Sequence, residues 1–306
     1  RPGRGDSPAP GWSEGWPALE SRWRAQGFPT APRRFEAPPW RGEPLAGKSI
    51  LLYEEQGRGD AIQFARFIPH LAALGATETV EVGRDLVPLF RHSFAGLATV
   101  IETGAPVPPT DFVCPLMSLP LALGATPDAI PGAVPYLFAD PAKAAAPRSR
   151  LKSDTLNVGV VWAGNPAFAD DRRRSPGYAP LAPLFDVPGV RWFGLRTGPA
   201  PFPNYVDLGP AVVADFSDTA AVMAGLDLVI SSCTAAAHLA GALGRPVWIM
   251  LAKSADWRWL ADRDDSPWYP TARLFRQTSA GEWDGVAARI AAALALAVEA
   301  KGSMRE

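Results

Sequence analysis

Cysteine, histidine and long apolar runs are all scarce in this 306-residue sequence. Two cysteines, Cys114 and Cys233, are too few for a disulfide framework or a zinc site, and a reducing cytoplasm is the simplest compartment for such a chain. The three histidines form no His-x-x-x-His pair, and there is no Cys-x-x-Cys motif or Ser-His-Asp order, so we expect no metal site and no hydrolase triad. No apolar run approaches the roughly 18 residues that a membrane-spanning helix needs, so we predict no membrane span.

An excess of either charge is also missing. The 30 basic and 31 acidic residues give a formal net charge of -1, which argues against a nucleic-acid binder, since such proteins normally carry a basic surface. The hydrophobic fraction of 47% and the charged fraction of 20% are typical of a folded globular protein. A chain of this length fits two domains of roughly 100–200 residues each better than one core.

Local patterns divide the chain into an irregular leader and two similar halves. Residues 1–47 are rich in Pro, Gly, Trp and Arg and show no sustained period. After them, short apolar runs alternate with helical stretches, which predicts parallel strands joined by crossover helices. In the first half we predict strands at 50–53, 79–82 and 99–101 and helices at 61–74 and 86–92.

The same alternation restarts after a polar, Ala- and Pro-rich stretch at 139–154, which we interpret as the interdomain linker. In the second half we predict strands at 158–162, 190–195, 228–230 and 247–250 and helices at 218–226, 234–243 and 284–300. The predicted fold class is therefore α/β, with two Rossmann-like domains of parallel strands and ligands at the carboxyl ends of the strands, where the halves face each other. The predicted division is a leader at 1–47, a first domain at 48–140, a linker at 141–154, a second domain at 155–283 and a terminal helix at 284–306.

The first stretch that could carry chemistry is Glu54–Ala61, with the sequence EEQGRGDA. It lies between a predicted buried strand and a helix, where an open sheet presents its ligand groups. Gly57 and Gly59 permit close approach of a ligand to the backbone. Asp60 then stands at the predicted helix start, and the spacing fits a helix N-cap and a catalytic base equally well.

The second stretch is Ser231–Gly241, with the sequence SSCTAAAHLAG. A strand feeds a helix whose first turn carries only small side chains, so its backbone N–H groups are accessible and a diphosphate could bind there. His238 follows Thr234 by four residues and lies on the same helical face. The alternative is a small-residue helix packed closely on the sheet, with His238 as a hydrogen-bonded core residue. Taken alone, the pattern fits this alternative somewhat better.

Two further stretches combine charges with aromatic residues. Trp162–Ser175 ends in an arginine run that could clamp phosphate, although such runs are more often solvated loops. Asp256–Pro270 could stack a base or a sugar ring, or it could seal the two lobes. We favour the seal for Trp268 and Tyr269, and both interpretations remain open for Trp257 and Arg258.

Taken together, these motifs resemble the glycosyltransferase domain that is appended to bacterial tetratricopeptide-repeat proteins, a relative of glycosyltransferase family 9, the heptosyltransferases of lipopolysaccharide core synthesis. The resemblance covers nearly the whole chain from about Trp16, and the joint occurrence of its motifs is specific. The leader resembles the end of a last repeat and its linker, so we expect upstream tetratricopeptide repeats in the full-length protein. The matching motifs are EQGRGDAIQFARF at 55–67, VWAGNP at 161–166, HLAGALG at 238–244, DWRW at 256–259, SPWYP at 266–270 and RLFRQ at 273–277.

The resemblance implies a GT-B fold, with the acceptor on the N-terminal lobe, the nucleotide-sugar on the C-terminal lobe and the active site in the cleft between them. It also implies inverting, metal-independent transfer from a nucleotide-sugar donor to a protein or glycan hydroxyl, with no cofactor. Asp60 matches the candidate general base of the family. The residues that the resemblance places around the substrates are Gly57, Gly59, Gln63, Asn165, Arg172, Arg174, Cys233, Thr234, Ala235, His238 and Trp257.

One position departs from the family pattern. The family usually has Asp immediately before the threonine of its Asp-Thr-x-x-x-His motif, whereas this chain has Cys233. The change removes a carboxylate near the donor, so it could alter donor choice or weaken the enzyme. An alternative hypothesis is therefore a catalytically weak, GT-B-shaped binding module that acts as a partner scaffold. A GT-B epimerase is a third hypothesis, but the sequence shows no convincing acidic pair for it.

Overall fold

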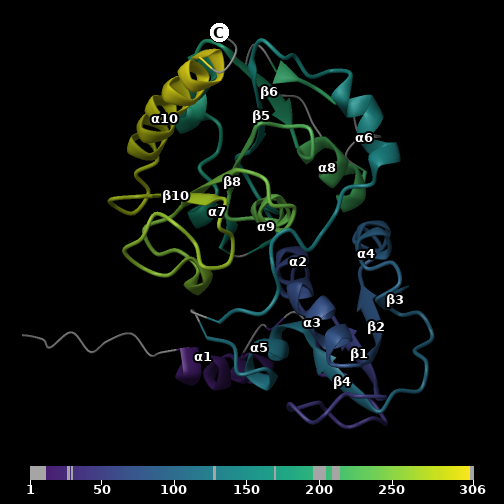
Figure 1. Cartoon of the computed structure of the whole chain (residues 1–306). Helices are drawn as coiled ribbons and strands as arrows, with labels where there is room; N and C mark the ends of the chain where they lie inside the picture. The colour runs from purple at the N-terminus through teal and green to yellow at the C-terminus, as the bar shows by residue number, and fades with distance from the viewer. Residues whose placement is uncertain are drawn as a thin grey trace, which may run out of the picture. The chain divides into compact units, whose positions relative to one another are not determined.

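The computed structural model describes residues 12–25, 28, 30–126, 129–168, 170–195, 205–208 and 214–303. The chain forms two compact units (Figure 1). The first unit takes its residues from the chain up to residue 83 and from 96–132, and the second from 84–95 and from residue 133 onward. The first eleven residues of the predicted leader lie outside the described residues.

The first unit is built on a parallel sheet with the strand order β3-β2-β1-β4. Its strands are β1 (Ser49–Tyr53), β2 (Thr77–Val82), β3 (Ala98–Glu102) and β4 (Phe112–Pro115). Because side chains alternate along a strand, Ile50 and Leu52 bury one face of β1 and Leu51 and Tyr53 the other. Trp23, Phe35 and Ala37 of the leader pack against that second face, so the leader forms part of this core.

Helical segments precede, connect and follow these strands. They are α1 (Trp12–Leu19), η1 (Glu20–Arg24), α2 (Arg58–Phe64), η2 (Ala65–Phe67), α3 (Ile68–Ala73), α4 (Val87–Ser93), η3 (Leu116–Ser118) and α5 (Leu119–Ala122). Helix α4 groups with the second unit and contacts its helix α8 (Phe216–Met223). The predicted single helix at 61–74 is wrong, since the 3-10 turn η2 separates α2 from α3. Pro69 in the first turn of α3 has no N–H to donate, which suits a fresh helix start.

The second unit is built on a parallel sheet with the order β10-β9-β8-β5-β6-β7. Its strands are β5 (Leu156–Val161), β6 (Val190–Gly194), β7 (Tyr205–Val206), β8 (Leu228–Ser232), β9 (Val247–Leu251) and β10 (Ala272–Arg276). Its remaining helical segments are α6 (Pro141–Arg148), α7 (Asp171–Arg174), η4 (Ala179–Asp186), α9 (Ala235–Ala242), η6 (Trp257–Trp259) and α10 (Asp284–Ser303). The α/β fold with two parallel sheets is thus confirmed.

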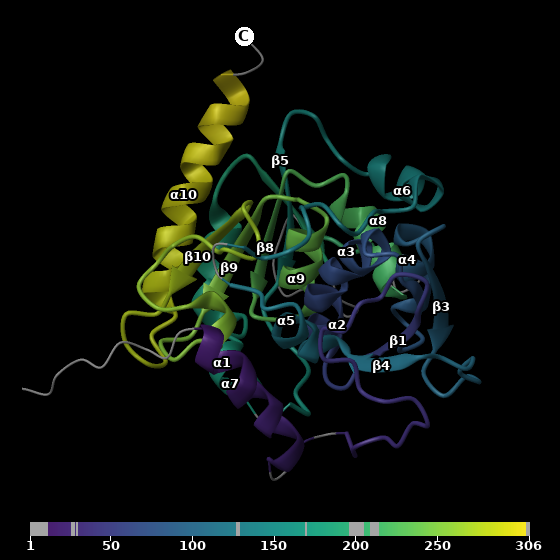
Figure 2. The same cartoon turned by 60° about the horizontal axis from the view of Figure 1, so that its bottom comes forward.

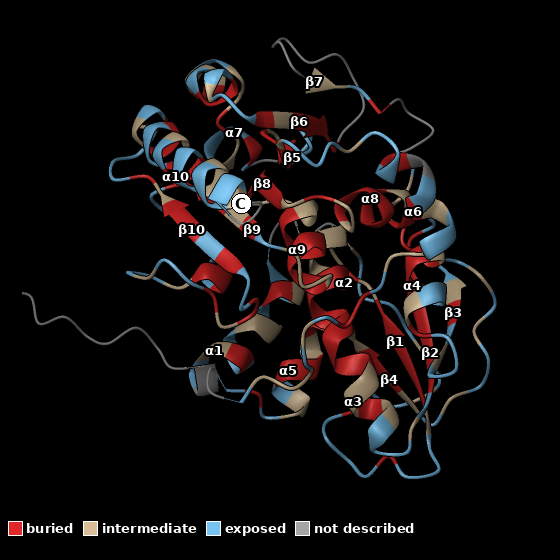
Figure 3. Cartoon of the chain, turned by 45° about the horizontal axis from the view of Figure 1, so that its top comes forward, coloured by how far each residue is buried: buried red, intermediate tan, exposed pale blue. Residues whose placement is uncertain are grey.

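Buried apolar side chains hold the sheet of the second unit to its helices. Helix α10 packs on η4 and runs alongside β10 (Figures 1 and 2), and Trp192 meets Phe185 edge-on at a centroid distance of 4.9 Å. Helix α9 lies so close to Tyr269 that a Cβ atom on Gly241 would collide with the ring. Figure 3 shows β1, β2 and β8 coloured as buried and one side of α10 as exposed. None of the described helices is long and apolar enough to cross a membrane.

Two helix starts differ from what the sequence predicts. Helix α6 forms within the stretch at 139–154 that we interpret as a linker: Asp140 caps it by accepting the Ala142 N–H, and Pro141 fits its first position. Helix α8 begins at Phe216, two residues before the predicted start at 218. Asp215 is the N-cap, and Asp218 is the third residue of the helix, where the two carboxylates exchange hydrogen bonds with the backbone in a capping box.

Candidate functional site

The strand order of the second sheet creates a site at its carboxyl edge. From β5 the chain proceeds to β6 and β7 on one side, and it then returns to β8, β9 and β10 on the other. The loops after β5 and β8 therefore diverge, and such a switch point is where open parallel sheets bind their ligands. The predicted residues Asn165 and Arg174 follow β5, and Cys233 and Thr234 follow β8.

Thr234 is the N-cap residue of α9. Its backbone is extended, with φ -136° and ψ 175°, and its side chain makes no capping hydrogen bond. Instead, Thr234 Oγ1 lies 3.1 Å from Oγ of the fully buried Ser231. The backbone N–H groups of the first turn, which begins at Ala235, therefore have no cap from Thr234, and the helix dipole favours an anion at this end.

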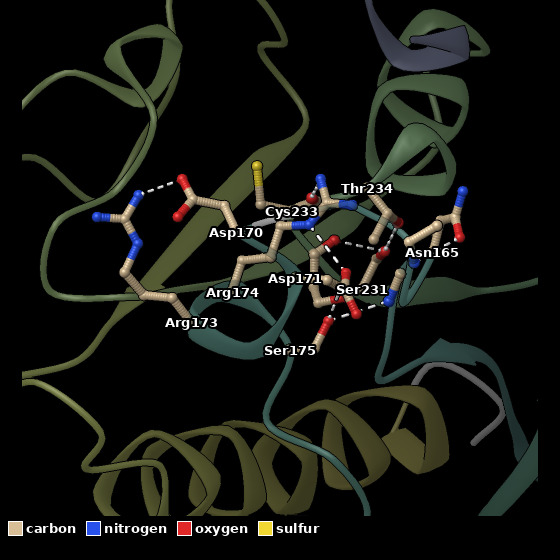
Figure 4. Close-up of polar contacts among 12 residues, drawn as sticks. Asn165, Asp170, Asp171, Arg173, Arg174, Ser175, Ser231, Cys233 and Thr234 are labelled. Carbon is tan, nitrogen blue, oxygen red and sulfur yellow. Dashed lines mark hydrogen bonds and ion pairs between the residues drawn. The ribbon is translucent and has the colours of Figure 1, made fainter. Parts of the chain in front are cut away.

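Arg174 ties the loop after β5 to the loop after β8 (Figure 4). Its Nε donates to Asp171 Oδ1 at 3.1 Å, and its Nη1 donates to the Cys233 carbonyl at 2.9 Å. The guanidinium carbon lies 4.4 Å from the centre of the Phe168 ring, a cation–π contact. Ser175 Oγ donates to Asp171 Oδ1 at 3.0 Å and accepts the Gly164 N–H at 3.0 Å.

A small pocket of about 100 Å³ opens beside this network. Arg174 and Cys233 are the two predicted site residues that line it. The other lining residues are Phe168, Asp170, Arg173, Leu251, Ala252, Ser254, Ala255 and Asp256. Charged residues of the lining form ion pairs. Arg173 bonds Asp170 at 2.6 Å, and Asp256 is bonded by Arg258 at 3.0 Å. Burial alone would raise the pKa of Asp256, but the Arg258 guanidinium outweighs it and the pKa is lowered.

Cys233 presents a neutral thiol to this pocket. The indole N–H of the buried Trp259 donates to Cys233 Sγ at 3.1 Å. Burial raises the pKa of the thiol, so it stays protonated at neutral pH. At the position where the related family usually has a carboxylate, this chain therefore adds no charge.

His238 is buried and is not among the residues that line the pocket. Its Nδ1 lies 2.9 Å from the Tyr269 hydroxyl, and its ring stacks on Trp259 with centroids 5.3 Å apart. Burial, aided by the Arg258 charge, lowers the pKa of His238 to about 3, so the imidazole is neutral. This geometry fits the alternative of a hydrogen-bonded core histidine.

The remaining predicted residues of the second unit lie outside the pocket lining. Asn165 Oδ1 accepts the Ala167 N–H at 3.0 Å and so closes a local turn. Arg172 is exposed, and Trp257 is half-exposed with Arg258 stacked 4.6 Å from its ring centre. Tyr269 and Trp268 are fully buried.

In the first unit, Asp60 lies in the first turn of α2. Gly57 is the N-cap residue, so the prediction that the helix opens at Asp60 is wrong. Asp60 is the third helical residue, and its Oδ2 accepts the Gly57 N–H at 3.0 Å. Gly59 lies inside the same turn, and Gln63 one turn later is fully buried. The carboxylate thus stabilises the helix start, at the carboxyl end of β1.

Sequence reasoning missed the partner of the neighbouring Glu55. Arg22 of the leader donates to Glu55 Oε1 at 2.9 Å and to Ser118 Oγ at 2.8 Å, and both charged side chains are buried. Burial raises the pKa of Glu55 to about 8, although the Arg22 guanidinium acts in the opposite direction. An arginine in an aperiodic leader gives no signal of such a contact. Asp171 and Ser175 were missed for a similar reason, since a run of charges does not show which members are buried.

No cluster of three or more His, Cys, Asp or Glu side chains that could hold a metal ion occurs within the described residues. Arg174 lines the pocket and donates to the Cys233 carbonyl, directly before the N-cap residue of α9, so a cation lies next to this helix start.

Several solved glycosyltransferases have a similar fold. Escherichia coli ADP-heptose lipopolysaccharide heptosyltransferase II is 14% identical and aligns with 82% of this chain and 99% of its own, with a TM-score of 0.56. A family 9 glycosyltransferase from Veillonella parvula is 12% identical over 78% of this chain and 88% of its own, with a TM-score of 0.51. The chain therefore has the GT-B fold of family 9 heptosyltransferases, as the sequence resemblance implied.

Two further comparisons complete this picture. The iron-containing dodecameric glycosyltransferase TibC from enterotoxigenic E. coli is 13% identical over 79% of this chain and 66% of its own, with a TM-score of 0.51, and it has been solved in complex with ADP-D-β-D-heptose. Protein FlbA of Caulobacter vibrioides is 31% identical over 317 aligned residues, which cover 92% of this chain and 52% of FlbA. The chain thus spans about half the length of this curated relative. No protein-family model matches the chain.

Proposed function

We propose that this protein is an inverting glycosyltransferase that moves a sugar from a nucleotide-sugar donor to a hydroxyl of a protein or glycan acceptor. The observation that carries the proposal is the contact of Arg174 with the loop that starts α9, at the β5–β8 switch point of a GT-B fold. In this proposal the second unit binds the donor diphosphate, and the first unit binds the acceptor.

The proposed reaction needs a base and a way to stabilise the leaving group. Asp60 accepts the proton of the acceptor hydroxyl while the hydroxyl oxygen attacks the anomeric carbon from the face opposite the diphosphate. The bond between the anomeric carbon and the diphosphate oxygen breaks, and the configuration inverts. The negative charge that develops on the diphosphate is stabilised by Arg174 and the α9 amides, so the proposed transfer needs no metal or other cofactor.

The donor class is proposed from the structural neighbours. Because TibC is solved with ADP-D-β-D-heptose, an ADP-linked sugar is the first donor to test, before UDP-, GDP- and CMP-linked sugars. The protein or glycan acceptor and the upstream tetratricopeptide repeats stay predictions from the sequence resemblance, and the cytoplasmic location stays a prediction from the low cysteine count.

The second candidate function is a GT-B-shaped binding module without turnover. One observation favours it: Cys233 is a neutral thiol where the related family usually has a carboxylate. Asp60, Thr234 and His238 all remain in their motifs, so we place transfer first.

Asp60→Asn separates the two candidates. We would incubate the protein with nucleotide-sugars and a bacterial extract as acceptor source, and measure the released nucleotide by mass spectrometry. A transferase releases nucleotide, and Asp60→Asn lowers the rate by roughly 10²- to 10⁴-fold without changing nucleotide affinity, because only the base is lost. Nucleotide binding with no release from any donor would support the binding module. Release that Asp60→Asn leaves unchanged would contradict the role of Asp60.

A further inference from the structure

We propose that Asp171, backed by Ser175 and Gly164, is a positioning residue that fixes Arg174 in the orientation in which it receives an anionic phosphate group. This inference rests on the proposed function, since it deepens the role of the same pocket. These three residues lie in the stretch Trp162–Ser175 that the sequence singles out, but the sequence assigned no role to any of them.

Two neighbouring arginines of α7 differ sharply in how they are held. Arg173 makes an ion pair with Asp170 in which both side chains are more than half exposed, so the pair adds little fixed orientation. Arg174 is 25% exposed, and its partner Asp171 is 10% exposed. An arginine side chain has about 2 kcal/mol of rotamer entropy, and these contacts fix the Arg174 side chain before any ligand binds.

The contacts of Arg174 leave most of its donors for a ligand. A guanidinium has five N–H donors, and the bonds to Asp171 and to the Cys233 carbonyl use one on Nε and one on Nη1. The ring of Phe168 covers one face of the guanidinium. Arg174 therefore lines the pocket in one defined orientation, which is what bidentate recognition of a phosphate requires.

Asp171 is in turn fixed from behind, as Figure 4 shows. The Ser175 hydroxyl donates to the same Oδ1 atom that Arg174 contacts, and the Gly164 N–H donates to that hydroxyl. Gly164 also provides the space, because a Cβ atom there would collide with Asp171 Oδ1 and with the Arg174 guanidinium. The end of β5 thus positions a cation that reaches across to the end of β8.

The test uses inorganic pyrophosphate as the probe and calorimetry in the presence of EDTA. Asp171→Asn weakens pyrophosphate binding by roughly tenfold or more, because the charge-assisted bond to Arg174 is lost. The matched control is Asp265→Asn, the same substitution in the surface Arg263–Asp265 pair, whose residues do not line the pocket. It changes the affinity by no more than about twofold, as expected of a surface ion pair. Equal effects of the two substitutions would overturn the proposal.

Chemical rescue separates positioning from a merely structural effect. In Arg174→Ala, added guanidinium ion restores pyrophosphate binding because Asp171 still offers its carboxylate to the ion. In the double variant Asp171→Asn/Arg174→Ala the rescue is lost. Equal rescue in both variants would overturn the role of Asp171. A wild-type protein that binds no pyrophosphate would overturn both the donor site and this inference, whereas wild-type binding that Asp171→Asn leaves intact would overturn the positioning role alone.

Discussion

Glu78 is a single buried residue that lowers the stability of the first unit when its carboxyl group is charged. It lies on β2, between Ile50 on β1 and Ala98 on β3, and only 2% of its surface is exposed. Neither carboxyl oxygen has a hydrogen-bond partner, and burial raises the pKa of Glu78 from 4.5 to about 8. The folded state therefore favours the protonated acid, and a charged Glu78 at higher pH destabilises the folded state.

The expected result is a pH-dependent gain in stability from Glu78→Gln. Because the folded pKa is raised, the contribution of Glu78 is fully present below about pH 4.5 and is lost as the pH rises toward 8. Glutamine is neutral and of similar size, so at about 1.4 kcal/mol per pKa unit the variant should unfold with a free energy roughly 5 kcal/mol above wild type at pH 9 and about equal to it at pH 4.5. Urea denaturation at both pH values measures this. An equal difference at the two pH values would show that Glu78 is ionised in the folded protein.

Among the elements, the leader contributes more to the fold than its composition suggests. It covers the face of the sheet that carries Leu51, Tyr53 and Val113. Two ion pairs to buried carboxylates hold the leader in place. Arg33 bonds Glu81 at 2.8 Å, and Arg22 bonds Glu55. The Trp40 N–H also donates to the Val113 carbonyl at 2.8 Å, which adds a backbone contact beside β4.

Deletion of residues 1–40 should therefore destabilise the first unit. The deletion exposes one apolar face of the sheet and leaves the carboxylates of Glu55 and Glu81 without their arginines, so amides in β1 and β2 should lose most of their protection from hydrogen exchange. The control is deletion of residues 1–11, which keeps every leader contact named above. Mass spectrometry of exchanged peptides measures both variants. Unchanged protection of β1 after the longer deletion would show that the leader is dispensable.

The same elements show what the sequence could and could not predict. Strands such as β1, β8 and β9 were predicted because continuous apolar runs bounded by glycine mark buried parallel strands. Helix α6 was missed because its Ala- and Pro-rich stretch looks like a linker, whereas a distant contact between Lys143 and Asp218, at 2.7 Å, holds it on α8. Of the candidate site residues, Arg174 and Cys233 were predicted because they lie in the motifs that resemble the family. The burial of Asp171 depends on the fold around it, and no local pattern encodes that.

For the whole molecule, the most direct test is nucleotide binding without metal. Purified protein in EDTA would be heated with ADP, UDP, GDP or CMP, alongside Thr234→Trp, whose bulky side chain would fill the start of α9. We predict that one nucleotide at one hundred times its dissociation constant stabilises the protein by about 2.7 kcal/mol and that Thr234→Trp abolishes this shift. The absence of a shift with every nucleotide, or a shift that Thr234→Trp leaves unchanged, would contradict a donor site at the β5–β8 switch point.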